Sequence, residues 1–355
     1  MAKLKTKKKY GGQVGKVIVA LLSIILTISA FIGYDYSQRI YAPNVVISID
    51  EEYLYIPTKS KFSDVLHGLH HNGFIVNTSS FEWLSEQKLY HKNIKPGRYK
   101  ISNGMSNNDL INLLRSGVQD PVQVSFNYIA LPEQLASKVT RNIEADSAKV
   151  LSIITSSKWA SKYGFNSQTF FTMFIPNTYE MWWNTTEEDL MDRMAKEYKR
   201  FWTNERKSKA SKIRLSQSEV SILASIVQRE TTKNDEKPTV AGVYYNRLKK
   251  GMLLQADPTL VYAVGDFTIR RVLNKHKKVD SPYNTYIHKG LPPGPICLPS
   301  IESIDAVLNV EDHEYIYFCA KPDGSGYHSF AKTYSQHLRN ARAFQRELNR
   351  KKVYK

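Results

Sequence analysis

The chain has 355 residues, which is enough to bury a sizeable core and to hold more than one domain. Its formal net charge is +17, and a surface this basic attracts polyanions, although solubility alone would explain the charge equally well. The two cysteines, Cys297 and Cys319, show no metal-ligand spacing, which excludes a cysteine-based metal site; they could form a disulfide in an oxidising compartment.

The N-terminus predicts a membrane anchor. Residues 1–16 contain six lysines and no acidic residue, and residues 17–34 carry no charge. A helix over that apolar run spans roughly 27 Å, close to the bilayer core of about 30 Å. We therefore expect a basic cytoplasmic tail over 1–16 and a single transmembrane helix over 17–35. Because the lysines flank its N-terminal end, the rest of the chain is expected on the outer, periplasmic side of the cytoplasmic (inner) membrane.

Two other interpretations of this segment are weaker. A cleaved signal peptide would have a shorter apolar run, and residues 29–38 make a poor cleavage site. A buried core helix would not follow a lysine cluster. With the anchor in place, the six lysines leave +11 on the outer part, where nucleic acid is not an expected partner. Peptidoglycan, whose stem peptides carry free carboxylates, is a polyanion on that side.

Residues 44–120 predict a small unit of strands and helices. β-Branched and aromatic residues favour two strands and a later third one, with helices between them. The expected strands are 45–50, 52–57 and 99–102, and the expected helices are 62–72, 81–90 and 106–116. Ser106 is the expected cap of the last helix, with Asp109 at the capping-box position. The histidines at 67, 70 and 71 have no carboxylate or cysteine partners, so we interpret them as surface residues.

Residues 122–212 lead into the central part of the chain. We expect a strand over 122–129, a helix over 131–143 and a charged, exposed helix over 187–206. Between them, Tyr179, Trp182 and Trp183 form an aromatic cluster of the kind on which a sugar ring stacks. Packing in the core explains these three residues at least as well.

The stretch from Ser216 to Tyr262 predicts the functional centre. Ser216 and Glu219 form a capping-box signature that starts a helix. The spacing of Val220, Leu223, Val227 and Glu230 places Glu230 on the apolar face of that helix. A carboxyl group held against apolar side chains has a raised pKa and can act as a general acid. The alternative is a solvated Glu230 at a frayed helix end.

Two more helices are expected directly after it. Pro238 suits the first turn of the second helix, with Asp235 or Glu236 near its positive end, and Gly251 ends it. Asp257 before Pro258 predicts an N-cap of a third helix ending near Gly265. Such closely spaced helix ends imply tight turns around one cleft.

The motifs LASIVQRET at 223–231, VAGVYYNRL at 240–248 and GMLLQADPTLVY at 251–262 resemble the central motifs of the endolytic murein transglycosylases, the MltG or YceG-like family. SPYNTY at 281–286, GLPPGPI at 290–296 and residues 323–337 follow in the family's order. The resemblance covers residues 44 to 345. It implies an α+β fold with an N-terminal transmembrane helix, a LysM-like α/β subdomain over 44–120, a YceG-like catalytic domain over 122–345 and a basic C-terminal tail over 346–355.

The segment at 174–184 resembles the family's FPDTY motif, with differences. Phe171 and Thr172 stand where the family commonly has Glu-Gly, and Asn177 stands where it commonly has Asp. Any role of those carboxylates is therefore not transferred to this chain.

The resemblance also implies the chemistry, a lyase reaction on peptidoglycan. Glu230 matches the family's catalytic acid/base, which protonates the glycosidic oxygen and then deprotonates the C6 hydroxyl of the same N-acetylmuramic acid (MurNAc). No metal or cofactor is expected. The expected partners are glycan strands, peptidoglycan synthases of the elongation or division machinery, and the membrane through residues 17–35. The candidate substrate-binding residues are Asn246, Gln255, Asp257, Tyr283, Asn284, Thr285 and His328, and helix capping is the alternative for Asp257.

Two other functions remain open from the sequence. An ordinary muramidase would pair Glu230 with Asp257 or Asp280 and leave hydrated reducing ends. A non-enzymatic peptidoglycan-binding scaffold would not need the carboxyl group of Glu230.

Overall fold

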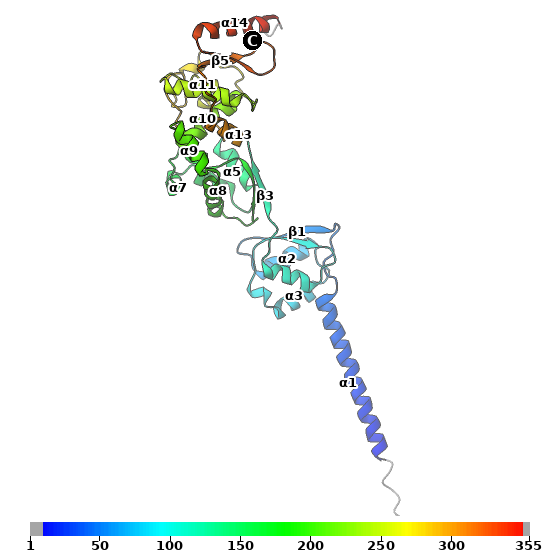
Figure 1. The fold of residues 1–355 in the computed structure, drawn as a ribbon. Helices are drawn as coiled ribbons and strands as arrows, with labels where there is room; N and C mark the ends of the chain where they lie inside the picture. The colour runs from blue at the N-terminus through cyan, green and yellow to red at the C-terminus, as the bar shows by residue number, and fades with distance from the viewer. Residues whose placement is uncertain (1–9, 351–355) are drawn as a thin grey trace, which may run out of the picture. The chain divides into compact units, whose positions relative to one another are not determined.

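The computed structural model describes residues 10–350, and the chain divides into two compact units (Figure 1). Unit 1 comprises the described residues up to 122 together with 182–184, and unit 2 comprises 123–181 and the described residues from 185 onward. Residues 1–9 of the predicted basic tail and residues 351–355 of the predicted C-terminal tail lie outside the described residues.

Unit 1 begins with a long apolar helix, α1, over Tyr10–Tyr41. The part from Val14 to Tyr41 is long and apolar enough to cross a membrane, and its side chains are exposed up to Tyr34, whereas Ile40 packs against the core of unit 1. The helix extends beyond both ends of the predicted span over 17–35. At its C-terminal end, the Arg39 carbonyl accepts a 2.9 Å hydrogen bond from the Asn107 amide, which ties the helix to the rest of unit 1.

The rest of unit 1 is one two-stranded antiparallel sheet packed with three helices. Its elements are β1 (Glu51–Ile56), α2 (Phe62–His71), α3 (Thr78–Gln87), the 3₁₀ turn η1 (Tyr90–Lys92), β2 (Gly97–Ser102) and α4 (Asn107–Ser116). The capping box of Ser106 and Asp109 is confirmed. Leu54, Leu69, Phe81, Tyr99 and Ile111 are among the residues of its buried core.

The predicted strand at 45–50 is wrong. Its backbone bonds to several separate segments instead of to one partner strand: Val45 N–H reaches Met105, and Val46 N–H reaches Phe74. Asn44 beside it is buried and bonds to Asn77 and Asn107. The β-branched residues therefore belong to a linker in which Val45 and Ile47 are buried and Val46 and Ile49 are exposed.

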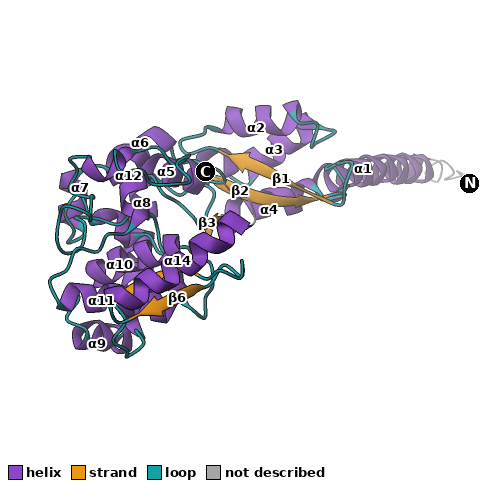
Figure 2. Ribbon diagram, turned by 90° about the horizontal axis from the view of Figure 1, so that it is seen from above, coloured by secondary structure: helices purple, strands orange, loops and turns teal. Residues whose placement is uncertain are grey.

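Unit 2 is mostly helical, with two short two-stranded sheets (Figure 2). Its first elements are β3 (Val122–Phe126), α5 (Pro132–Thr140), α6 (Ser147–Ile154), α7 (Ser157–Lys162), the 3₁₀ turn η2 (Phe170–Met173), β4 (Asn177–Met181), α8 (Glu187–Phe201) and α9 (Asn204–Lys212). The later elements are α10 (Gln217–Glu230), α11 (Lys237–Lys249), α12 (Asp257–Val264), the 3₁₀ turn η3 (His276–Lys278), α13 (Ile301–Leu308), β5 (Tyr317–Ala320), β6 (His328–Ala331) and α14 (Tyr334–Arg350).

The prediction of one exposed helix over 187–206 is wrong. The chain makes two helices, because α8 ends at Phe201 and Thr203 caps α9 through the N–H of Arg206. One face of α8 is buried through Leu190, Met191, Met194 and Tyr198. The many charged residues of this segment lie on the other face, and they make the apolar periodicity difficult to recognise in the sequence.

Helix α10 is the centre of unit 2. It contacts α9, α11, α12, α13 and η2. Every residue from Val220 to Val227 is buried, so the helix is enclosed on all sides rather than on the single face that the periodicity predicts. A helix surrounded by others in this way holds the groups at its two ends in fixed positions.

Candidate active site

Glu230 is the last residue of α10, and Thr231 after it is already extended. The predicted capping box at the other end is confirmed: Ser216 Oγ accepts from Glu219 N–H, and the Glu219 carboxylate accepts from Ser216 N–H at 2.8 Å. The C-terminal end of a helix carries partial negative charge, so it disfavours a carboxylate at Glu230. The residue is neither fully buried nor fully exposed, which leaves it open to a substrate.

Tyr244 on α11 holds the carboxyl group of Glu230. Its hydroxyl donates a hydrogen bond to Glu230 Oε1 at 2.5 Å. Tyr244 is 1% exposed, and its ring meets that of Phe318 edge-on at 5.8 Å. The sequence analysis missed Tyr244, and a tyrosine at helical spacing among apolar residues, here Val240 and Val243, is the signal that a polar partner lies nearby.

The surroundings raise the pKa of Glu230 to about 7. Burial of the carboxyl group among protein atoms is the largest cause, because it disfavours the charged form. The hydrogen bond from Tyr244 opposes this shift, the negative charge of Asp257 adds to it, and the positive charge of Arg247 opposes it. The predicted general acid therefore has a pKa suited to giving and taking a proton near neutral pH.

Asp257 is the second carboxylate of the site. The prediction that it caps a helix is wrong, since Ala256 is the N-cap and Asp257 is the first residue of α12. Its Oδ1 accepts a 2.5 Å hydrogen bond from Tyr286. Asp257 is exposed, and the sequence analysis missed Tyr286, which is the last residue of the SPYNTY motif.

Arg247 places a buried positive charge in the same site. Its guanidinium donates to the carbonyl groups of Ile316 at 2.7 Å and Leu254 at 2.6 Å. It is 8% exposed and forms no ion pair with a carboxylate among residues 10–350. Arginine within an apolar helical stripe is the sequence signal for such a charge.

Gln255 has a strained backbone. Its φ is +48°, in the left-handed region that non-glycine residues seldom adopt, and its side chain is exposed. The conformation is held because Gln255 N–H donates to the Thr285 carbonyl and Ala256 N–H donates to Thr285 Oγ1, both at 3.0 Å. Strain of this kind is typical of a residue that presents its side chain to a ligand.

Asn284 and Thr285 are buried and support this loop. The amide of Asn284 donates to the carbonyl groups of Lys277 and Val279, and Thr285 Oγ1 also lies 2.8 Å from Thr259 Oγ1. Their polar groups are thus used within the protein rather than presented to a substrate.

Asn246 is likewise engaged, whereas Tyr283 packs on another aromatic ring and stays partly exposed. The Asn246 amide donates to the carbonyl groups of His313 and Tyr315 at 2.7 and 3.1 Å. The ring of Tyr283 lies 4.7 Å from that of Tyr262 and is half-buried.

His328 pairs with Glu236, a partner that the sequence analysis did not foresee. Glu236 is 6% exposed and accepts from His328 N–H at 2.7 Å, while its Oε2 lies 2.8 Å from His328 Nδ1. Thr231 Oγ1 is a further donor at 3.2 Å. The imidazole also meets Phe318 edge-on at 5.1 Å, so it lies behind the ring that supports Tyr244.

Gly242 lets the 311–313 segment pack directly on α11. A Cβ atom at this position would lie 2.5 Å from His313 Nε2 and 2.9 Å from the Glu311 carbonyl oxygen. The close approach brings the carbonyl groups of His313 and Tyr315 within reach of Asn246.

The other predicted groups lie away from Glu230 or have ordinary structural roles. Tyr179 is buried against Phe126 in unit 2, whereas Trp182 and Trp183 belong to unit 1. Cys297 and Cys319 are both free thiols. Within residues 10–350, no group of His, Cys, Asp and Glu residues could hold a metal ion.

The residues that depart from the family pattern do not bring a carboxylate into the site. Phe171 and Thr172 are buried in η2, where Thr172 Oγ1 lies 3.3 Å from Ser218 Oγ. Asn177 is exposed at the start of β4, and its Oδ1 accepts from Thr178 N–H.

Comparisons with known proteins point to one family. A family model described as YceG-like matches residues 54–343. The endolytic murein transglycosylase of Bacillus subtilis (strain 168) is 29% identical over 300 residues, which cover 79% of this chain and 81% of that protein. The endolytic murein transglycosylase of Streptococcus pneumoniae serotype 2 (strain D39) is 27% identical over 356 residues, 91% of this chain but only 64% of that longer protein.

A solved structure has the same fold. The crystal structure of a yceG-like protein from Listeria monocytogenes matches with a TM-score of 0.55 and 26% identity, covering 82% of this chain and 98% of that chain.

Proposed function

This chain belongs to the YceG-like family and is a lytic transglycosylase of peptidoglycan, and we propose that it cuts nascent glycan strands from an anchor in the cytoplasmic membrane. In this proposal it cleaves the bond between MurNAc and N-acetylglucosamine within the strand, leaves 1,6-anhydro-MurNAc ends and so terminates elongation. The observation that carries the proposal is the carboxyl group of Glu230, with its pKa near 7 and its hydrogen bond from Tyr244.

One carboxyl group suffices for this reaction. The protonated Glu230 gives its proton to the glycosidic oxygen, and the C1–O bond breaks. The resulting carboxylate takes the proton from the C6 hydroxyl, whose oxygen forms the new bond to C1. The proton that leaves Glu230 returns to it, and no water is consumed. A pKa near the working pH allows both transfers, and the buried charge of Arg247 stabilises the carboxylate between them.

Asp257 is a poorer candidate for a catalytic base. Its carboxylate accepts the Tyr286 hydroxyl, and its negative charge raises the pKa of Glu230. We assign it, with Gln255 and Tyr283, to binding the sugar, since Gln255 and Asp257 are exposed. Asn246, Asn284, Thr285 and His328 hold the surrounding loops in our proposal, because their polar groups bond within the protein.

The remaining parts of the proposal concern location and partners. Helix α1 serves as a single-pass anchor, with the lysine-rich end in the cytoplasm and unit 2 on the outer side. The part of unit 1 after α1 acts as a LysM-like glycan-binding module over residues 44–120. A peptidoglycan synthase of the elongation or division machinery supplies the strand.

The mass of the released glycan ends tests the reaction. The full chain in detergent is incubated with purified, uncrosslinked peptidoglycan, and the products are analysed by mass spectrometry. Ends lighter by one water than hydrolytic ends are expected. Hydrated reducing ends would show a muramidase with a second carboxylate, and the absence of any release would favour a non-enzymatic scaffold.

A further inference from the structure

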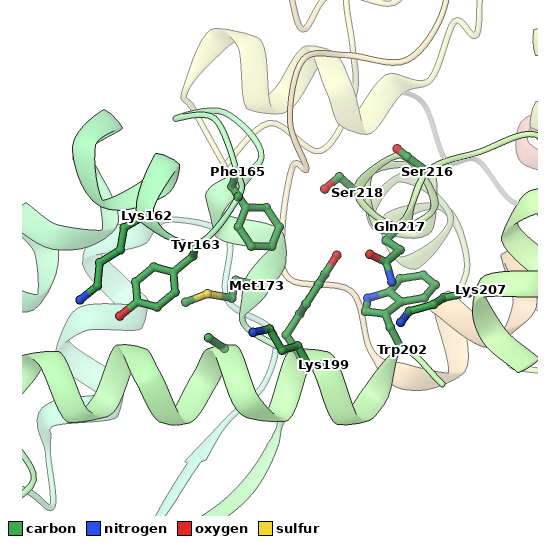
Figure 3. Close-up of a pocket in the computed structure, with 13 residues that line it drawn as sticks. Lys162, Tyr163, Phe165, Met173, Lys199, Trp202, Lys207, Ser216, Gln217 and Ser218 are labelled. Carbon is green, nitrogen blue, oxygen red and sulfur yellow. The ribbon is translucent and has the colours of Figure 1, made fainter. Parts of the chain in front are cut away.

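A cavity lies in unit 2, at the opposite end of α10 from Glu230 (Figure 3). Its volume is about 360 Å³, and it is lined by residues that follow α7, by α8, by α9 and by the first turn of α10. The rise of an α-helix places Gln217 and Glu230 roughly 20 Å apart along α10, so this cavity is separate from the proposed catalytic site.

The lining of this cavity is cationic. Lys162, Lys199 and Lys207 line it, and no acidic residue does. Lys162 lies over the rings of Trp159 and Tyr163, at 4.4 and 5.3 Å. Lys199 and Lys207 reach toward the cavity from α8 and α9, and neither forms an ion pair within the described part of the chain (Figure 3). Two unpaired ammonium groups at a concave site attract an anion.

A buried donor without a partner points into the same space. Trp202 is 1% exposed, and its Nε1 has no hydrogen-bond partner among residues 10–350. Figure 3 shows the indole nitrogen facing the space between Lys199 and Gln217. A buried N–H left unpaired destabilises the fold, and an indole N–H can only donate. An acceptor on a ligand would remove that destabilisation.

The start of α10 supplies further donors. The N–H groups of the first turn of a helix have no partner within the helix and carry partial positive charge. The capping box uses the N–H of Glu219, whereas Gln217 and Ser218 line the cavity. This helix end, the lysines and the Trp202 indole thus favour the same negative ligand.

The walls show that the ligand is more than a bare ion. Phe165, Met173, Tyr198 and Ala195 line the cavity with aromatic and aliphatic surface. A small inorganic anion would leave that surface without contacts. No arginine lines the cavity to form a bidentate hydrogen bond with a phosphate. A carboxylate on a short aliphatic body satisfies both the donors and the walls.

We propose that this cavity binds the free carboxyl-terminal end of a short peptide with small side chains. The source of that peptide rests on the proposed function, in which glycan strands carry stem peptides with free carboxylates.

The test follows the Trp202 indole directly. The full chain in detergent, labelled with ¹⁵N at its five tryptophans, is titrated with N-acetyl-D-alanyl-D-alanine. Trp202→Phe assigns the signal. We expect a saturable shift of the Trp202 N–H, no such shift with the same peptide as its terminal amide, and about ten-fold weaker binding for Lys199→Gln with Lys207→Gln. Lys196→Gln, a substitution of an exposed lysine on α8 outside the cavity, is the matched control and should bind like the wild type.

Several results would overturn the assignment. These are equal shifts with the acid and the amide, the absence of any shift, or unchanged binding by the double lysine variant. Inorganic phosphate that displaces the peptide at equal concentration would show a general anion site instead. Glu230→Gln should bind the peptide with unchanged affinity, so failure of the proposed cleavage reaction and failure of this binding site are separate outcomes.

Discussion

Glu230 and Glu236 are separated by one short turn, yet the protein surrounds their carboxyl groups in opposite ways. Glu236 accepts from Thr231, from the backbone of His328 and from its ring. For Glu230, Tyr244 is the one donor found among residues 10–350. Several hydrogen bonds stabilise the charged form of a carboxylate, which then serves to link segments of the fold. A single hydrogen bond stabilises the charged form less, so the group binds a proton more readily. The number of donors, more than burial itself, therefore separates the carboxylate with a structural role from the proposed catalytic one.

Removing the acid from Glu230 has the largest expected effect. Glu230→Gln keeps the size of the side chain and can still accept from Tyr244, but it cannot donate and recover a proton. We expect cleavage of peptidoglycan to fall by roughly 10²–10⁴-fold or more, with no decrease in the thermal unfolding temperature. Glu219→Gln is the matched control at the other end of α10, because glutamine also suits a capping box. Cleavage by Glu230→Gln at the wild-type rate would rule out the mechanism.

The raised pKa of Glu230 also predicts how stability depends on pH. Its pKa is about 7 in the folded protein and 4.5 in the unfolded chain, so between these values the folded state holds a proton that the unfolded state releases. The stabilising contribution is complete below pH 4.5 and is lost as pH rises through 7, with a size of up to about 3 kcal/mol. The unfolding free energy of the wild type minus that of Glu230→Gln, measured by denaturant titration, should fall as pH rises from 4.5 through 7. If this value rose with pH instead, the environment described for Glu230 would be wrong.

Glu236→Gln should act on stability instead. The change replaces an acceptor of several hydrogen bonds by an amide that cannot accept from all of them, and we expect a loss of about 2 kcal/mol of unfolding free energy. Asp235→Asn, at an exposed neighbour, should change stability by less than about 0.5 kcal/mol. If Glu236→Gln abolished cleavage in a protein of unchanged stability, the division between structural and reactive carboxylates would be wrong.

Tyr244→Phe gives the smallest change and refines the comparison. It removes the hydroxyl that holds Glu230 and keeps the aromatic ring, so a loss of about ten-fold in rate is expected from one hydrogen bond. Because this hydrogen bond lowers the pKa of Glu230, the fall in activity at alkaline pH should move to higher pH. The pH–rate profile measures both effects, and Tyr245→Phe serves as the neighbouring control. An alkaline limb that moved to lower pH would show that Tyr244 does not stabilise the carboxylate.

The sequence predicts correctly those hydrogen bonds whose two partners are close together in the chain. The capping boxes at Ser106 and Ser216 are bonds between positions three apart, so the sequence contains both partners side by side. Glu230 is predicted as the catalytic acid because its spacing and its motif agree, and its buried, raised-pKa environment is consistent with that prediction.

Long-range partners could not be predicted in the same way. His328 meets Glu236 across 92 positions of the chain, so no local pattern connects them. The predicted substrate contacts at Asn246 and Asn284 instead hold backbone carbonyl groups. Polar residues in a motif indicate that a hydrogen-bonding side chain is required at that position. Whether this side chain bonds to a ligand or to a loop of the protein depends on tertiary packing.

Gly242 determines how closely α11, which carries Tyr244, packs in the proposed catalytic centre. It is two residues before Tyr244, and the His313 side chain occupies the place of its missing Cβ. Any larger residue would push α11 away from the 311–313 segment, and a displacement near 1 Å at a catalytic group can cost about 10²-fold in rate. The absence of a side chain at Gly242 thus keeps the Tyr244 hydroxyl within hydrogen-bonding distance of Glu230. Replacing this glycine with alanine would raise the helix propensity of α11 but would displace Tyr244 from Glu230.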